Sequence, residues 1–251
     1  MNPNPTLRVL SSMQRHGVQH LLMGGQACVF YGAAEFSRDV DFAIFASDEN
    51  LTRLKLALQE LQAEVIAVPS FEKAHLLRGH AVHFRCQASG AEGMRVDVMT
   101  RMRGVDPFPE LWERRTTLVI DELEIDLMSL PDLVQAKKTQ RLKDWPMLQR
   151  LIEANWFQHQ DEPTSQRIAF WLQECRSPEI LLQLARRFPN ETISETRNRP
   201  LLEAAINQDS EAVEKNLESE RLLIVEEDKA YWKSLREELE LMRKQIRDKH
   251  Q

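Results

Sequence analysis

The segment "DVDFAIFA" (residues 39–46) constrains this chain most, because it places two carboxylates in an otherwise apolar stretch. Its composition predicts a buried strand. Side chains two positions apart on a strand point to the same face, so Asp39 and Asp41 lie side by side. Neighbouring carboxylates repel each other, and removing them from water costs free energy. A divalent cation removes that cost, and carboxylate oxygens are ligands that Mg²⁺ prefers.

A third carboxylate occurs in a similar setting. Asp97 lies in "RVDVM", with apolar residues on both sides, after the two-glycine hairpin signal "ASGAEG". On a strand next to residues 39–46, it would complete a clamp for two metal ions, which is an arrangement used in phosphoryl transfer.

Gly24 and Gly25 follow the apolar strand pattern "HLLM" and precede the short helical pattern "QACVFYG". Two glycines let the backbone approach a ligand closely, and the start of a helix directs free N–H groups at an anion. Strand, Gly-Gly, helix and a strand with D-x-D therefore predict a phosphate cradle beside a metal site.

The motifs "GGQACVFYGAAEFSRDVDF" and "RVDVM" resemble those of the polymerase-beta-like nucleotidyltransferase superfamily, over roughly residues 18–150. They are most similar to bacterial nucleotidyltransferase-like proteins, among them the AbiEii-type toxins of toxin–antitoxin systems. The resemblance implies a mixed sheet flanked by helices and transfer of a nucleoside monophosphate from a nucleoside triphosphate, dependent on Mg²⁺ or Mn²⁺. It also implies that Asp39, Asp41 and Asp97 are the catalytic and metal-binding residues.

The same resemblance implies a set of nucleotide-binding residues: Gly24, Gly25, Ser37, Lys137, Arg141 and Asp144. Within "LVQAKKTQRLKDW", Lys137, Arg141 and Asp144 are spaced i, i+4 and i+7 and are expected on one helix face, closing over the nucleotide. The alternative is a solvated helix face whose charges pair with one another.

Glu35 departs from the pattern, because relatives often carry Arg at this position. "KDWPML" also lacks the second carboxylate of the more usual K-D-x-x-D. An acid near a triphosphate weakens the attraction for phosphate. A second hypothesis is therefore a catalytically inactive binding module, for example the partner of a toxin.

Strand and helix patterns alternate up to residue 128, and every later segment is helical in pattern. We therefore predict an α+β fold, with a nucleotidyltransferase-like domain at 1–128 and a helical domain at 129–251, one helix of which completes the nucleotide site. The chain has 251 residues, 42% of them hydrophobic, enough for one large domain or two small ones.

The net charge of −6 excludes a uniformly basic nucleic-acid coat and leaves room for a local basic patch. Three dispersed cysteines predict reduced thiols in an intracellular protein. No secretory signal is visible, and no apolar run approaches the ~20 residues that span a bilayer. We expect a cytoplasmic protein without a membrane partner.

The expected partners are a nucleoside triphosphate and an acceptor, for which a tRNA end, a protein hydroxyl and a small molecule all stay open. The C-terminal segment 228–249 has apolar residues at helical spacing, namely Trp232, Leu235, Leu239, Met242 and Ile246. This seam either packs on its own chain, self-associates or binds a partner.

Overall fold

The computed structural model describes residues 4–120 and 122–249, which form two compact units. The first contains the chain up to Phe30, Ala34–Ala136 and the residues from Tyr231 onward. The second contains Tyr31–Ala33 and Lys137–Ala230. The predicted domain boundary at residues 128/129 stays a prediction.

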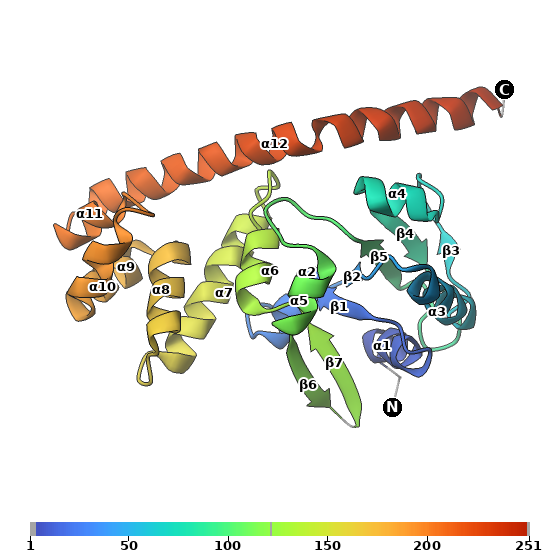
Figure 1. Ribbon diagram of the computed structural model, residues 1–251, viewed down its shortest axis with the longest axis horizontal. Coiled ribbons are helices and arrows are strands. Elements are labelled where there is room, and N and C mark those ends of the chain that lie inside the picture. Colours follow the sequence, from blue (N-terminus) through green and yellow to red (C-terminus); the bar gives the residue numbers. More distant parts are fainter. Residues whose placement is uncertain (1–3, 121, 250–251) are drawn as a thin grey trace. The chain divides into compact units, whose positions relative to one another are not determined.

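A mixed seven-stranded sheet forms the centre of the first unit, in the order β3-β4-β5-β2-β1-β7-β6 (Figure 1). β2 runs parallel to β5, and β1 runs parallel to β7, whereas the other neighbours are antiparallel. The strands are β1 His20–Met23, β2 Asp39–Ile44, β3 Glu64–Val65, β4 Val82–Arg85, β5 Arg95–Met99, β6 Thr116–Ile120 and β7 Leu123–Leu127. The predicted mixed sheet is confirmed, and both aspartate-bearing segments are strands within it.

Helices of the first unit follow the local signals of the sequence. Ser47 caps α3 by accepting a hydrogen bond from the Asn50 backbone N–H, and the apolar stripe of α3 is buried. The helices are α1 Pro5–Arg15, α2 Gly24–Phe30, α3 Asp48–Glu60, α4 Lys73–Arg78, α5 Phe108–Glu113 and α6 Leu130–Ala136. They flank the sheet, as predicted (Figure 1).

The described residues of the second unit form helices and connecting turns, which confirms the predicted helical C-terminal region. The helices are α7 Asp144–His159, α8 Ser165–Glu174, α9 Pro178–Arg187, α10 Pro189–Glu195, α11 Leu202–Ile206 and the first part of α12 Ser210–Lys249. The rings of Trp156 and Trp171 pack edge to face in the core, with their centroids 4.8 Å apart. Within the described residues, no helix has the length and apolar character needed to cross a membrane.

The last part of α12 belongs to the first unit and contacts it through α4 and the residues that follow α4. Glu238 accepts a hydrogen bond from Arg78 Nε at 2.9 Å and lies 2.9 Å from Nε2 of the buried His80. Leu235 is buried, whereas Leu241 and Ile246 are exposed. The predicted seam thus packs on its own chain at Leu235, and self-association or partner binding through 228–249 stays a prediction.

The side chain of Asn50 on α3 forms hydrogen bonds to the residue before β1 and to the residue after β2. Its buried amide accepts from the Gln19 N–H at 2.7 Å and donates to the carbonyls of Gln19 and Phe45 at 2.9 and 2.8 Å. Asn50→Ala should lower the free energy of unfolding by about 2–4 kcal/mol, because three bonds are lost and their partners stay buried. Thr52→Ala, on the exposed side of α3, should cost less than ~0.5 kcal/mol in the same urea titrations. Equal losses of unfolding free energy in the two variants would show that the hydrogen bonds of Asn50 do not stabilise the fold.

Candidate active site

Three carboxylates meet on the neighbouring strands β2 and β5. The parallel register places Asp41 opposite Asp97 and Asp39 opposite Arg95. Asp39, Asp41 and Asp97, here called the acidic triad, each offer an oxygen atom, and these atoms all lie within 4.8 Å of one another. Asp97 is buried, and the other two are half-buried. The structure therefore brings together the three predicted residues, as a group that can hold a metal ion.

The donor set of the acidic triad suits Mg²⁺ or Mn²⁺. It consists of carboxylate oxygens alone, which are the preferred ligands of these hard cations. Three like charges at this distance also need a compensating positive charge. The residues present thus fit the metal that the sequence predicted.

Arg95 supplies part of that compensation at Asp97, and His83 lies beside the same carboxylate. Arg95 donates from Nε to Oδ1 and from an Nη to Oδ2 of Asp97, both at 2.8 Å. His83, opposite Asp97 on β4, places Nδ1 2.9 Å from Oδ1 of Asp97 and 3.0 Å from an Nη of Arg95. With the proton on Nδ1 it donates to the carboxylate, and without it Nδ1 accepts from Arg95. Burial raises the pKa of Asp97, but the bonds from His83 and Arg95 outweigh it and hold the pKa below its ordinary value. Asp97 is therefore ionised at neutral pH.

The Gly-Gly pair makes room for side chains of the site. Gly24 has φ +67°, and a Cβ atom there would lie 1.8 Å from Oδ2 of Asp41. A Cβ atom on Gly25 would lie 2.6 Å from Oγ of Ser37. Both glycines are thus required by the approach of Asp41 and Ser37 to the backbone, a reason that the sequence alone does not supply.

Ser37 orients the first member of the triad. Its hydroxyl lies 3.0 Å from the backbone carbonyl oxygen of Asp39 and 3.1 Å from Oδ1 of the same residue, and donates to these acceptors. Ser37 therefore positions Asp39 within the structure. Contact of Ser37, Gly24 and Gly25 with a nucleotide stays a prediction.

The expectation that Lys137, Arg141 and Asp144 share one helix face is wrong. α6 ends at Ala136 and α7 begins at Asp144, so the first two residues lie in the connection. The buried Asp144 accepts from the Thr139 hydroxyl at 2.6 Å and from Arg141 Nε at 2.8 Å, and Lys137 Nζ lies 3.7 Å away. These side-chain bonds take the place of a continuous helical ladder. A role of the three residues in nucleotide binding stays a prediction.

Comparisons with solved structures give distant likenesses. No family model matches the chain, and no curated protein matches its sequence. It is similar to the crystal structure of an antigenic nucleotidyltransferase-like protein from Paracoccidioides brasiliensis, at 16% identity and a TM-score of 0.39. The match covers 81% of this chain and 92% of that one. A likeness of this degree does not decide the activity of this chain.

Gly24→Ala should disrupt the acidic triad, because the added methyl group takes the place of the Asp41 carboxylate. We expect the affinity for Mn²⁺, measured by calorimetry with a nucleoside triphosphate present, to fall at least about tenfold. Gly93→Ala is the matched control, since Gly93 also has positive φ and a Cβ atom there meets nothing within 4 Å. It should cost about 1 kcal/mol of stability and leave Mn²⁺ affinity unchanged. Equal affinities in both variants would remove Asp41 from the metal site.

Arg95→Ala should destabilise the protein in a pH-dependent way. The lowered pKa of Asp97 contributes stability that is present above the unfolded-state pKa, about 3.9. This stabilisation is lost as the pH falls through the folded-state pKa of Asp97. We expect a loss of about 1–2 kcal/mol at pH 7, allowing for solvent screening of the half-exposed Arg95, and a smaller loss below about pH 3.5. Urea titrations at both pH values test this, and an equal loss at each would contradict it.

Proposed function

We propose that this chain is a Mg²⁺- or Mn²⁺-dependent nucleotidyltransferase, which moves a nucleoside monophosphate from a nucleoside triphosphate to an acceptor. The observation that supports it is the convergence of the acidic triad within 4.8 Å, on parallel strands beside Gly24 and Gly25. A structural core has no need of three carboxylates together, since their charges cost stability. A phosphoryl-transfer site needs such a group.

Each residue of the site has a separate role in the proposed reaction. Asp39 and Asp41 would supply carboxylate ligands to the cations that bind the triphosphate, and Ser37 fixes the orientation of Asp39. Asp97, held by Arg95 and His83, lies beside them in ionised form. When bound, the divalent cations neutralise the carboxylates and the triphosphate charge.

In the proposed reaction, the hydroxyl oxygen of the acceptor forms a bond to the α-phosphorus. The bond from the α-phosphorus to the oxygen that bridges it to the β-phosphorus breaks, and pyrophosphate leaves with that electron pair. The proton of the hydroxyl passes to the carboxylate of Asp97, which then loses it to solvent. Positioning and charge compensation supply most of the rate of such a step.

The alternative, an inactive binding module that pairs with a toxin, rested on Glu35. Glu35 is exposed, in the loop between α2 and β2, and the acidic triad is complete. We therefore favour the enzyme. Relation to the AbiEii-type toxins and a cytoplasmic location stay predictions.

Incubation with each α-labelled nucleoside triphosphate, Mg²⁺ and either total RNA or cell lysate tests the proposal. We expect label to be transferred by the unaltered protein and to fall about a hundredfold or more in Asp41→Asn and Asp97→Asn. Asp48→Asn changes an exposed carboxylate on α3 and should transfer label normally. Equal transfer by all variants would refute the assignment, and nucleotide binding without any transfer would support the inactive module.

A further inference from the structure

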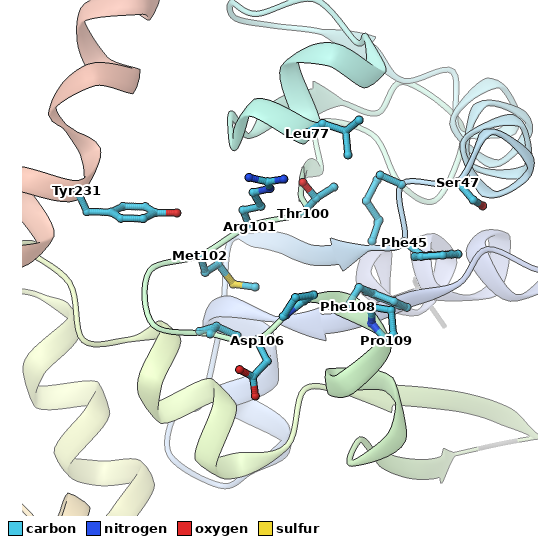
Figure 2. A pocket seen from close by; sticks show the side chains of 14 residues that line it. Phe45, Ser47, Leu77, Thr100, Arg101, Met102, Asp106, Phe108, Pro109 and Tyr231 are labelled. Carbon is cyan, nitrogen blue, oxygen red and sulfur yellow. The ribbon is translucent and has the colours of Figure 1, made fainter.

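The last part of α12 borders a cavity of the first unit near each of its ends. One cavity, of about 580 Å³, is lined by Tyr231, and Figure 2 shows the Tyr231 ring pointing toward it. Its aromatic rings are already paired, because Phe108 stacks on both Phe45 and Trp112, with centroids 5.7 Å apart in each pair. The cavity at the other end of this part of α12 combines an open strand edge with unpaired charge.

This second cavity, here called the edge groove, lies between the end of α12 and the segment that begins at β3. Its volume of about 630 Å³ falls in the range of binding sites. The side chains of Val65 and Ile246 are 43% and 45% exposed, so the groove contains apolar surface that the chain does not bury. Both segments belong to the first unit. The lining includes Val65, Ala67, Val68, Arg243, Ile246 and Arg247.

β3 is the last strand of the sheet, and its outer edge is open. Among the described residues, β3 pairs with β4 alone. Ile66 donates its backbone N–H to the carbonyl of His83 at 2.9 Å. Because alternate residues of an antiparallel pair bond to the neighbouring strand, Val65 directs its own N–H and C=O away from β4. An open edge of this kind is a template for pairing with another extended chain. Val65 brings this edge into the lining of the groove.

The opposite wall of the groove carries two exposed arginines. Arg243 and Arg247 lie one helical turn apart on α12. Over the part of the chain that the structure describes, neither guanidinium has a recorded hydrogen bond or ion pair, and no acidic residue lines the groove. The groove is therefore positively charged, although the whole chain has a net charge of −6. Carboxylates are the groups that a guanidinium binds best in a protein partner.

We propose that the edge groove binds an extended acidic segment of a partner protein, which adds a strand to the open edge of β3. The backbone of the segment pairs with the N–H and C=O of Val65, and its carboxylates contact Arg243 and Arg247. Its apolar side chains cover the exposed surface of Val65 and Ile246. Carboxylates two residues apart on a strand are separated by about 6.6 Å, close to the ~5–6 Å between side chains one helical turn apart. The segment therefore carries acidic residues at alternate positions.

The chemistry of the groove favours a peptide over a polynucleotide, which is also negatively charged. A polynucleotide has no backbone N–H and C=O groups at the spacing of a strand, so it leaves the edge of β3 unpaired. Within the described residues, no aromatic side chain on which a base could stack lines the groove. The proposal does not depend on the nucleotidyltransferase activity, because none of its contacts involves the acidic triad.

Fluorescence anisotropy with the intact protein and a labelled synthetic peptide tests the binding. In the peptide, glutamates alternate with valines between Gly-Ser ends, and a matched peptide carries lysines in place of the glutamates. We expect the acidic peptide to bind and the lysine peptide not to bind. The net charge of the chain would by itself favour the opposite order.

Variants of the protein test the two walls of the groove separately. Arg243→Ala and Arg247→Ala should each weaken binding about fivefold, whereas Lys244→Ala, on a neighbouring exposed cation outside the lining, should change the Kd less than about twofold. Val65→Pro removes an N–H from the open edge and none from the pairing with β4, so binding should weaken about tenfold. Val65→Thr keeps the N–H and the shape of the side chain and should bind about as the unaltered protein does.

N-methylated peptides separate strand addition from attraction between charges without any change to the protein. Methylation of every glutamate nitrogen and methylation of every valine nitrogen remove the N–H groups of opposite edges of the added strand. We expect one of these peptides to lose binding and the other to keep it. Equal binding by the two would overturn strand addition.

Other results would overturn the proposal as a whole. They are no binding of the acidic peptide up to about 1 mM, binding that Arg243→Ala and Arg247→Ala leave unchanged, or displacement of the peptide by an equal concentration of single-stranded RNA. The last result would assign the groove to a polynucleotide. Unchanged melting temperatures of the variants establish that a loss of binding is not a loss of folding.

Discussion

Electrostatic repulsion within the acidic triad is the constraint on which the rest of the site depends. Three carboxylates within 4.8 Å lower stability unless positive charge compensates them, and the hydrogen bonds of Arg95 go to Asp97. The surrounding sequence nevertheless keeps the group close together, because Gly24 leaves space for one carboxylate and Ser37 holds another. Such an arrangement costs stability and is therefore typical of a site that a cation and a charged substrate complete.

The central strand β2 connects this charged group to the core. Its alternate side chains, Phe42 and Ile44, are fully buried on the opposite face from Asp39 and Asp41. Apolar packing on one face thus fixes the backbone that presents the carboxylates on the other, which is how a rigid element supports a site. At the end of the strand, Asn50 holds the chain where it leaves the sheet, by donating to the carbonyl of Phe45.

The features that the sequence predicted correctly are local ones. Strand alternation placed Asp39 and Asp41 on one face. The glycine pair was predicted to approach a bound anion, whereas in the structure it makes room for the side chains of Asp41 and Ser37. The contact of His83 with Asp97 was not predictable, because it depends on the register of β4 against β5. The helix expected across Lys137–Asp144 was wrong for a related reason. Periodicity does not reveal that Asp144 is buried and binds the connection between α6 and α7.

The most direct test of the metal site is anomalous diffraction from crystals grown with Mn²⁺ and a non-hydrolysable nucleoside triphosphate. We expect a Mn²⁺ peak bridging the acidic triad, with carboxylate oxygens at about 2.0–2.3 Å and the triphosphate on the side of Gly24 and Gly25. A Mn²⁺ ion bound elsewhere, with none at the acidic triad in the presence of saturating nucleotide, would contradict a metal-dependent function for these three aspartates.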